Sequence, residues 1–371
     1  MSTNPEARAW LRVRAESLRS NYSQVRDAAG REARVIPMVK ADAYGLGMPE
    51  VVRALQPLGP WGWGVATLEE GLALRALDVD DPVVVFSPLG PHELEPAVRR
   101  GLQVCVSSLD SLEALGGAAA RAGTTARMHV DVDTGMGRTG FDWRTGPEWL
   151  PRIREAVGGR IEWVGCFTHM HSAEDDPESV REQWTRFRSV LDALEDPPAD
   201  LMCHALNSAG AFTAPGYAVD AIRPGIFLYG GRVGADHPEP APVVSLHARV
   251  CHVREAAAGT TLGYGATYEA SGLERWATLA VGYGDGLPRS LGNRGSALVA
   301  GRRVPIIGRI SMDLTVVDIT DMSGVRVGDV ATLLGAEGEE EITLDHVAEL
   351  AGTISYEILT GFTRRLPRIW T

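Results

Sequence analysis

The sequence predicts an α/β protein: a (β/α)8 barrel of the TIM type followed by a mainly β domain. Over the first two-thirds of the chain, about eight short apolar segments alternate with helical patterns, which is typical of βαβ units and a parallel sheet. Eight repeats favour a closed barrel over an open sheet. Three prolines between residues 238 and 242 then indicate a linker. We therefore expect a barrel over residues 1–237 and a β domain over 238–371, with residues 9–14 pairing with the second domain.

Each strand is predicted from a short apolar run, and each helix from an amphipathic period. The helix after the second strand has the clearest start, because Thr67 and Glu70 have the spacing of a capping box. We expect barrel strands at residues 35–39, 62–66, 83–86, 102–106, 126–132, 163–167, 202–206 and 221–222, and helices at 67–77, 108–121 and 177–194. In the β domain we expect strands at 243–253, 276–281, 303–307, 314–319 and 329–334, and a short helix at 344–350.

The composition argues against several classes of protein. The 371 residues include 36 Lys and Arg against 48 Asp and Glu, a net charge of −12. An acidic chain repels a phosphate backbone, so nucleic acid is not an expected partner. No apolar run approaches the roughly 18 residues that cross a bilayer, and the first residues lack the apolar core of a signal peptide. The widely spaced Cys105, Cys166, Cys203 and Cys251 lie in strand-like runs and predict buried free thiols in a reducing cytoplasm.

The first chemical motif is V-K-A-D-A-Y-G-L-G at residues 39–47. It places Lys40 at the C-terminal end of the first predicted strand, and barrel enzymes carry their active sites at that end. A lysine among apolar neighbours can have its pKa lowered by burial and can act as an amine nucleophile. A solvent-facing lysine at a strand end is the alternative.

Two further motifs supply charged or hydrogen-bonding side chains. In D-T-G-M-G-R-T-G at 133–140, the glycines permit a sharp turn that would point Arg138 inward, where its planar fork suits a carboxylate. A solvated arginine on a tight loop fits this motif equally well. T-H-M-H at 168–171 weakly resembles a metal pair, but no carboxylate cluster accompanies it, so no metal is expected. We interpret His169 as a hydrogen-bonding group of the pocket and His171 as structural.

The motif H-A-L-N-S-A-G at 204–210 follows a predicted strand. It places Asn207 and Ser208 where a helix begins, and the free N–H groups of a helix N-terminus attract anions. An ordinary serine cap is the alternative.

The motif I-R-P-G-I-F-L-Y-G at 222–230 would end the eighth strand, where barrels often bind phosphate. Arg223 would point inward, and Gly225 and Ile226 would offer backbone N–H groups. A packed turn between strand and loop is the alternative.

Four motifs of the second domain contain aromatic or sulfur side chains. They are L-G-Y-G-A-T-Y, V-G-Y-G-D-G, G-R-I-S-M-D and T-I-S-Y-E-I, which contain Tyr264, Tyr283, Met312 and Tyr356. Taken singly, tyrosines of β domains are most often packing residues.

In combination, these motifs resemble those of the pyridoxal-phosphate-dependent alanine racemase family. The resemblance runs from about residue 9 to residue 370. It rests on seven of these motifs, which occur in the family's order: V-K-A-D-A-Y-G, D-T-G-M-G-R, N-S-A, R-P-G-I-x-L-Y-G, G-Y-G-A-T-Y, G-R-I-S-M-D and T-I-S-Y-E-I. Seven motifs in order are far more specific than any one of them. It implies that Lys40 holds pyridoxal 5'-phosphate as a Schiff base. It also implies a two-base mechanism on the external aldimine, in which Lys40 and the other subunit's Tyr264 act on opposite faces of the substrate Cα.

The resemblance implies the remaining roles residue by residue. Arg138 and the backbone N–H of Met312 would bind the substrate carboxylate, and Arg223 would face the pyridine nitrogen, with His169 behind it. Tyr283 would line the substrate entry, and Asp313 is a supporting residue. The cofactor-binding residues would be completed by Asn207 and by a phosphate cradle of Tyr44, Ser208, Gly225, Ile226 and Tyr356.

The implied reaction is the interconversion of L-alanine and D-alanine by a homodimer with shared active sites, which supplies D-alanine for peptidoglycan synthesis. A racemase of broader or different amino-acid specificity is the nearest alternative, because the same groups serve any side chain that fits. Two other classes are less well matched. Tyr264 and Arg223 argue against a pyridoxal-phosphate decarboxylase or aldolase, because those reactions need no two-base pair. The second domain argues against the pyridoxal-phosphate-binding proteins that consist of the barrel only.

The chain departs from the family pattern at one position. Family members often carry a carbamylated lysine two residues before the aspartate of D-T-G-M-G-R, and here that position is Asp131. An aspartate supplies negative charge directly but on a shorter stem, so Asp131 is predicted to pair with or orient Arg138. An ordinary strand aspartate is the alternative.

Overall fold

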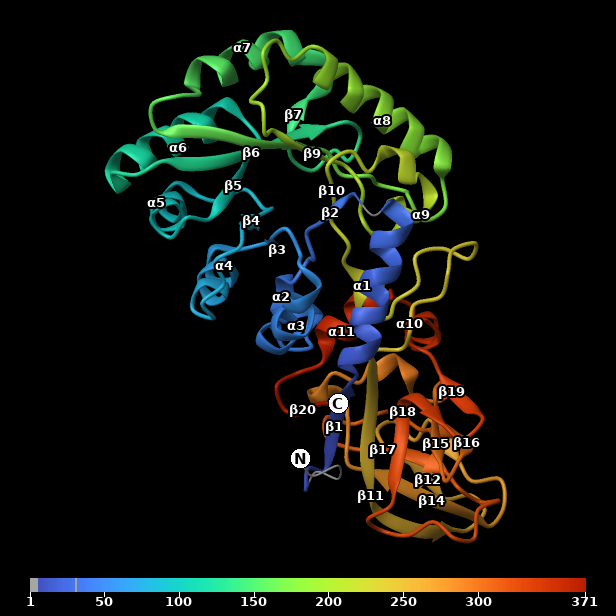
Figure 1. Cartoon of the computed structure of the whole chain (residues 1–371). Coiled ribbons are helices and arrows are strands. Elements are labelled where there is room, and N and C mark those ends of the chain that lie inside the picture. The colour runs from blue at the N-terminus through green and yellow to red at the C-terminus, as the bar shows by residue number, and fades with distance from the viewer. Residues whose placement is uncertain (1–5, 31) are drawn as a thin grey trace.

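The computed structural model describes residues 6–30 and 32–371. The chain forms a barrel of strands with helices on its outside, joined to a domain made mainly of strands (Figure 1). The fold class predicted from the sequence is therefore confirmed.

The barrel contains eight parallel strands in the order β2-β10-β9-β8-β6-β5-β4-β3. A parallel bridge between Met38 and Gly64 joins the segment after β2 to β3, which closes the ring. The strands are β2 (Arg34–Val35), β3 (Trp63–Val65), β4 (Val83–Val85), β5 (Gln103–Val106), β6 (Ala126–Asp133), β8 (Ile161–Phe167), β9 (Met202–His204) and β10 (Ala221–Ile222). The first strand is shorter than predicted, because Pro37 has no N–H to donate to the ladder.

Helices cover the outside of the barrel (Figure 1). They are α1 (Ala15–Ala29), α3 (Met48–Leu55), α4 (Leu68–Arg75), α5 (Pro91–Arg99), α6 (Leu109–Ala122), α7 (Gly146–Ala156), α8 (Pro177–Asp192) and α9 (Ser208–Thr213). The predicted capping box at the start of α4 is confirmed, since Thr67 and Glu70 each accept a hydrogen bond from the other's backbone N–H. The short β7 (Phe141–Asp142) pairs with the end of β6.

Six antiparallel strands form a second closed ring in the C-terminal domain, because β18 pairs with both β11 and β15. They are β11 (Val244–Ala256), β14 (Glu274–Leu279), β15 (Ser296–Val299), β16 (Arg302–Ile307), β17 (Thr315–Asp318) and β18 (Val330–Glu337). The hairpin of β12 (Thr261–Leu262) and β13 (Tyr268–Glu269), the edge strand β19 (Glu340–Ile342), and the helices α10 (Leu344–Ala351) and α11 (Ser355–Gly361) complete this domain.

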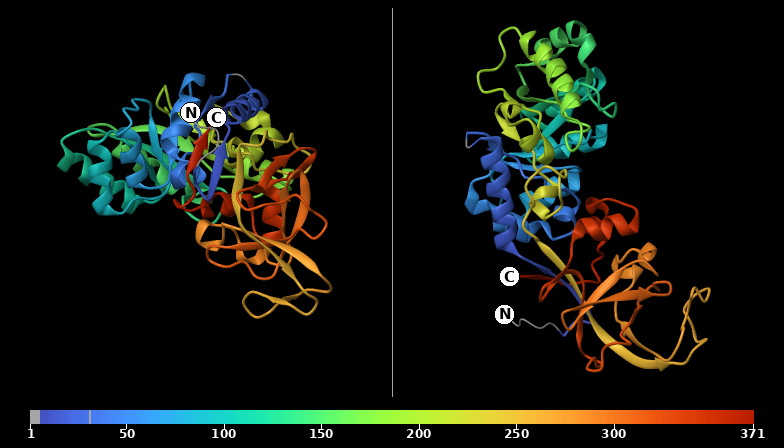
Figure 2. Two further views of the ribbon diagram at one scale, coloured as in Figure 1. Left: turned by 90° about the horizontal axis from the view of Figure 1, so that it is seen from below. Right: turned by 90° about the vertical axis from the view of Figure 1, so that its right-hand side faces the viewer.

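The N-terminal strand lies in the C-terminal domain. Strand β1 (Ala9–Val13) runs antiparallel to β11 and parallel to β20 (Arg368–Trp370). Figure 2 shows the N- and C-terminal strands, in blue and red, beside the long β11. From β1 in the β domain, the chain therefore enters the barrel through α1.

The four cysteines lie in strands, as predicted, but they are not all buried. Cys105 and Cys166 are buried and Cys203 is half-buried, whereas Cys251 is exposed. The expectation for Cys251 was wrong because the register of β11 against β14 shifts between Val250 and His252, and an irregularity of this kind turns a side chain out of the ladder. None of the described helices is long and apolar enough to span a membrane.

Candidate functional site

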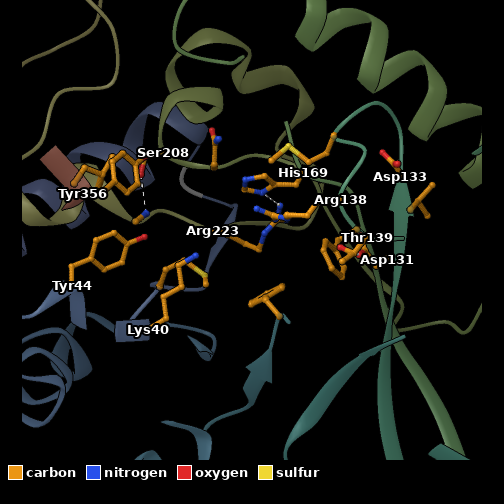
Figure 3. Close-up of a pocket in the computed structure, with 18 residues that line it drawn as sticks. Lys40, Tyr44, Asp131, Asp133, Arg138, Thr139, His169, Ser208, Arg223 and Tyr356 are labelled. Atoms are coloured by element: carbon orange, nitrogen blue, oxygen red, sulfur yellow. Dashed lines mark hydrogen bonds between the residues drawn. The ribbon is translucent and has the colours of Figure 1, made fainter. Parts of the chain in front are cut away.

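A pocket opens at the C-terminal ends of the barrel strands (Figure 3). Eleven predicted site residues line it: Lys40, Tyr44, Asp131, Arg138, His169, Asn207, Ser208, Arg223, Gly225, Ile226 and Tyr356. Figure 3 shows Tyr44, Ser208 and Tyr356 gathered at one end and Arg138 at the other, with Lys40 and Arg223 between them. Tyr356 comes from α11, so the C-terminal domain contributes to the pocket of its own barrel.

Four predicted residues do not line this pocket. Tyr264, Tyr283 and Met312 lie in the C-terminal domain with exposed fractions of 68%, 40% and 51%. Asp313 accepts a hydrogen bond from Arg365. The structure therefore separates the two residues predicted as catalytic, Lys40 and Tyr264, within one chain.

Lys40 begins an unusual turn rather than ending a strand. The four residues after it, Ala41 to Tyr44, all have φ between 53° and 55°, and left-handed backbone costs a non-glycine residue about 1–2 kcal/mol. Contacts from outside the turn hold it in place. Oε1 of Glu70 accepts a 2.6 Å hydrogen bond from the N–H of Ala41, and Oδ1 of Asp42 accepts a 2.8 Å hydrogen bond from the N–H of Met48.

The amine of Lys40 has a pKa below its usual value. Burial is the main cause, and the positive charges of Arg138 and Arg223 act in the same direction, while the carboxylate of Glu70 opposes them. A larger share of the amine is therefore neutral near pH 7, which is the form that acts as a nucleophile or a base.

Two tyrosines and a serine form the other end of the pocket. The ring of Tyr44 stacks on that of Tyr229 at 4.4 Å and lies 6.0 Å from that of Tyr356. Burial raises the pKa of Tyr44 and of Tyr356, so both hydroxyls stay protonated and can donate. Ser208 accepts a 2.8 Å hydrogen bond from the N–H of Gly225.

Two details of this end were not predicted from the sequence. The helix cap of α9 is Asn207, whose side chain accepts a 2.9 Å hydrogen bond from Gly210, and not Ser208. In addition, a Cβ on Gly225 would lie 2.2 Å from the hydroxyl oxygen of Tyr44. Gly225 is thus required for the close approach of Tyr44.

Arg223 is buried, and the groups that accept its hydrogen bonds are uncharged. Its NH2 donates to the carbonyl oxygen of Thr168 at 2.7 Å and lies 3.4 Å from Nδ1 of His169, while its NH1 donates to Nδ1 of His204 at 2.7 Å. Burial, followed by the charge of Arg223, lowers the pKa of His169 to about 3. His169 is therefore neutral at physiological pH.

Asp131 acts on the loop of Arg138 and not on its guanidinium. Oδ2 of Asp131 accepts hydrogen bonds from Ser107 at 3.2 Å and from Thr139 at 2.8 Å. Burial raises the pKa of Asp131, and these two hydroxyls oppose the shift. Within the described residues, Arg138 is exposed and makes no hydrogen bond of its own. The direct pairing of Asp131 with Arg138 is thus absent, and the contact is to the neighbouring Thr139.

The remaining sequence interpretations concern His171 and metal binding. His171 is exposed and lies 2.7 Å from the hydroxyl of Ser172. No cluster of three or more His, Cys, Asp or Glu side chains able to hold a metal is present in residues 6–30 and 32–371.

Sequence reasoning missed several residues that support the site. They are Glu70 beside Lys40, Ser107 and Thr139 beside Asp131, and Gln103, His129 and His204 behind Arg223. One signal was available for His129, because residues i and i+2 of a strand share a face and Asp131 lies two positions further along β6.

Known proteins match this chain along nearly its whole length. The family model "Alanine racemase, N-terminal domain" matches residues 13–233, and "Alanine racemase, C-terminal domain" matches residues 243–370. The alanine racemase of Carboxydothermus hydrogenoformans is 38% identical over 368 residues, which are 97% of this chain and 99% of that protein.

Solved structures agree with the sequence matches. Alanine racemase from E. faecalis superposes with a TM-score of 0.91 at 32% identity and covers 100% of both chains. Alanine racemase from Bartonella henselae, described as having covalently bound pyridoxal phosphate, gives a TM-score of 0.90 at 29% identity over 98% of this chain and 100% of that one. With both domains matched in order and fold, the chain belongs to the alanine racemase family of enzymes.

Proposed function

We propose that this enzyme interconverts L-alanine and D-alanine with pyridoxal 5'-phosphate as its cofactor. One observation carries the proposal. The amine of Lys40, the hydroxyl of Tyr44 and the guanidinium of Arg138 all line one pocket, and none of them hydrogen-bonds to another described residue. Donors left without acceptors around a cavity are those that a phosphate and a carboxylate would satisfy.

The residues of the pocket fit pyridoxal phosphate from end to end. Tyr44, Ser208 and Tyr356 would hold its phosphate, and Lys40 would bind it covalently. Arg223 would meet its pyridine nitrogen as a hydrogen-bond donor, and an arginine does not readily give up its proton. The ring nitrogen would therefore remain unprotonated. When bound, the cofactor supplies an electron sink that weakens the Cα–H bond of the substrate.

The chain's own groups would then orient the substrate and move its proton. Arg138, with the loop held by Thr139 and Asp131, would bind the carboxylate and fix the direction of the Cα–H bond. The lowered pKa of Lys40 prepares its amine to exchange the proton on one face. A second proton-transfer group is needed on the opposite face. Among the described residues that line this pocket, the only tyrosines are Tyr44 and Tyr356, and both lie at the phosphate end.

The partner subunit's Tyr264 would supply that second group in a homodimer. Tyr264 and Met312 are large, and more than half of each side chain is exposed on the C-terminal domain, outside the pocket of their own chain. Exposed side chains of this kind commonly mark an interface. A two-fold dimer would bury both copies, because a two-fold axis repeats each contact.

We place the reaction in the cytoplasm, where D-alanine would be consumed in peptidoglycan synthesis. The substrate range is the finer part of the proposal. Racemisation rates for alanine, serine, lysine and arginine, measured with added pyridoxal phosphate, are expected to be highest for alanine. A higher rate with another amino acid would favour a racemase of broader specificity.

A complementation experiment tests the shared site. Lys40→Ala and Tyr264→Phe variants are each expected to be inactive alone. When the subunits are mixed and allowed to exchange, half of the dimers are mixed and each contains one intact site, so about a quarter of the wild-type activity should return. No recovery in a sample shown to have exchanged subunits would contradict shared sites, and racemisation by Tyr264→Phe alone would contradict its role as a base.

A further inference from the structure

A row of three uncharged polar side chains crosses the barrel interior behind Arg223. The first is His204, whose Nδ1 lies 2.7 Å from NH1 of Arg223. Nε2 of His204 lies 3.0 Å from Nδ1 of His129, and Nε2 of His129 lies 2.7 Å from Oε1 of Gln103. Both histidines are 0% exposed and Gln103 is 6% exposed. The row is therefore closed to solvent along its length.

A glycine makes this row possible. His204 lies on β9 and His129 on β6, and β8 runs between those two strands. A Cβ at Gly165 of β8 would lie 2.0 Å from Nδ1 of His129. Only the absence of a side chain at Gly165 lets the two imidazoles meet across β8.

The direction of every hydrogen bond in the row follows from Arg223. A guanidinium only donates, so Nδ1 of His204 must accept. A neutral imidazole has one N–H, so Nε2 of His204 donates to Nδ1 of His129. The Nε2–H of His129 then donates to Gln103. Each imidazole is thereby fixed in its Nε2–H tautomer.

The row contains no compensating negative charge. Burial, with the charge of Arg223 second, lowers the pKa of His129 to about 3 and that of His204 well below its usual value. Asp131 and Cys105 also act electrostatically on Arg223, but Asp131 bonds to Ser107 and Thr139. Among the described residues, no carboxylate forms an ion pair with Arg223. The far end of the row is an amide rather than a carboxylate.

We propose that His129 and Gln103 are positioning residues for Arg223. They hold His204 in the tautomer that accepts from the guanidinium, which keeps Arg223 fully charged and oriented towards the pyridine nitrogen of the cofactor. The proposal rests on the proposed function for the identity of that cofactor. The direction of the hydrogen bonds in the row does not depend on that identity.

The tautomers can be measured directly in the unmodified chain. With histidine labelled by 15N, the side-chain spectra of the full chain loaded with pyridoxal phosphate should show His129 and His204 as Nε2–H tautomers. Neither should titrate between pH 8 and pH 5.5. An Nδ1–H tautomer at either residue, or a proton taken up in that range, would overturn the proposal without any variant.

A Gln103→Glu substitution tests the effect on the cofactor. The carboxylate would still accept from His129, but it would favour a protonated His129 whose Nδ1–H points at His204. The single proton of His204 would move to Nδ1, where it opposes the N–H of Arg223. Arg223 would thereby lose the acceptor of its NH1 hydrogen bond, and hydrogen bonds that involve a charged group are among the stronger ones. The dissociation constant of pyridoxal phosphate should therefore rise at least about tenfold, and its bound absorption spectrum should change with pH.

Gln24→Glu is the matched control, because it adds the same charge on α1 outside the barrel interior. It should leave the cofactor spectrum and affinity unchanged. Wild-type cofactor affinity and spectrum in Gln103→Glu would overturn the proposal. Correct tautomers in a protein that racemises no amino acid would instead contradict the proposed function, so the two failures are distinguishable.

Discussion

One carboxylate oxygen of Glu70 lies 2.6 Å from the backbone nitrogen of Ala41, the residue after Lys40, and accepts its hydrogen bond. The other oxygen accepts from Ala66 and Thr67 at the start of α4. The same side chain thus caps a barrel helix and supports the left-handed turn that carries the lysine. Its negative charge also opposes the lowering of the Lys40 pKa.

A Glu70→Gln substitution should therefore alter both the turn and the lysine. Glutamine has one acceptor oxygen, so at least one of these N–H groups loses its partner, at a cost of about 1 kcal/mol of stability. Loss of the charge should lower the Lys40 pKa further. The pH at which pyridoxal phosphate reacts half-maximally with the lysine should fall, as a stopped-flow absorbance series would measure.

Glu69→Gln is the control for that variant, since Glu69 is exposed in the same helical turn. It should change neither the stability nor the pH at which pyridoxal phosphate reacts half-maximally with the lysine. An unchanged pH midpoint in Glu70→Gln would show that Glu70 has no electrostatic effect on Lys40.

Asp131 should control substrate affinity through Thr139. Asp131→Asn and Thr139→Val each weaken the contact that holds the loop of Arg138, so each should raise the KM for alanine about tenfold, with a smaller change in kcat. Steady-state kinetics in both directions provides the measurement. Thr124→Val, on an exposed turn, should leave KM unaltered. If only Asp131→Asn raised KM, the carboxylate would act by a route other than Thr139.

Gly225→Ala should weaken cofactor binding. The added Cβ would lie 2.2 Å from the Tyr44 hydroxyl oxygen, so Tyr44 must move, and overpacking of this kind costs about 1–3 kcal/mol. The dissociation constant of pyridoxal phosphate, from an absorbance titration, should rise about tenfold. Gly216→Ala has open space around the new methyl group and is the matched control. Equal affinities in the two variants would mean that the position of Tyr44 does not matter for binding.

Stability should fall as the pH drops below about 6.5. Burial lowers the pKa of His129 and His169 to about 3 and that of His247 to about 4, so the unfolded chain, with a histidine pKa of about 6.5, binds more protons in this range. Each such histidine removes about 1.4 kcal/mol of stability per pH unit between its two pKa values. Urea unfolding at pH 7, 6 and 5 would measure the slope. A flat profile would contradict neutral buried histidines.

A His129→Gln variant isolates one of these groups. It should reduce the slope between pH 6 and 5 by about 1.4 kcal/mol per pH unit, whatever its stability at pH 7. His92→Gln, at an exposed position of α5, should leave the slope as it is.

The sequence predicted most of the barrel because its strands are short apolar runs that alternate with helical patterns, and five of the eight runs lead into a chemical motif. The pocket followed, since the C-terminal ends of parallel strands meet at one edge. The left-handed turn after Lys40 could not be predicted in this way. Ala, Asp and Tyr have no strong preference for positive φ, and the turn depends on Glu70 and other contacts beyond it.

The row behind Arg223 was missed for a related reason. His129, His204 and Gln103 are far apart in sequence and lie on three strands, and the contact of the two histidines depends on the missing Cβ of Gly165 on a fourth. Periodicity describes which face a residue occupies but not which residues meet across a barrel. The exposed Cys251 shows the same limit, because its orientation is set by a register shift against β14.

The pairing of β1 with β11 also sets an order of events during synthesis. Val13 lies opposite Val244, so the first strand to leave the ribosome has its partner only after about 230 further residues have been made. Contacts of such long sequence separation form late. A fragment beginning after the linker would leave the edge of β11 unpaired, and open edges promote aggregation. The two domains match separate family models, but each depends on the other for folding. A gene cut at the linker should therefore not give two independently folding proteins.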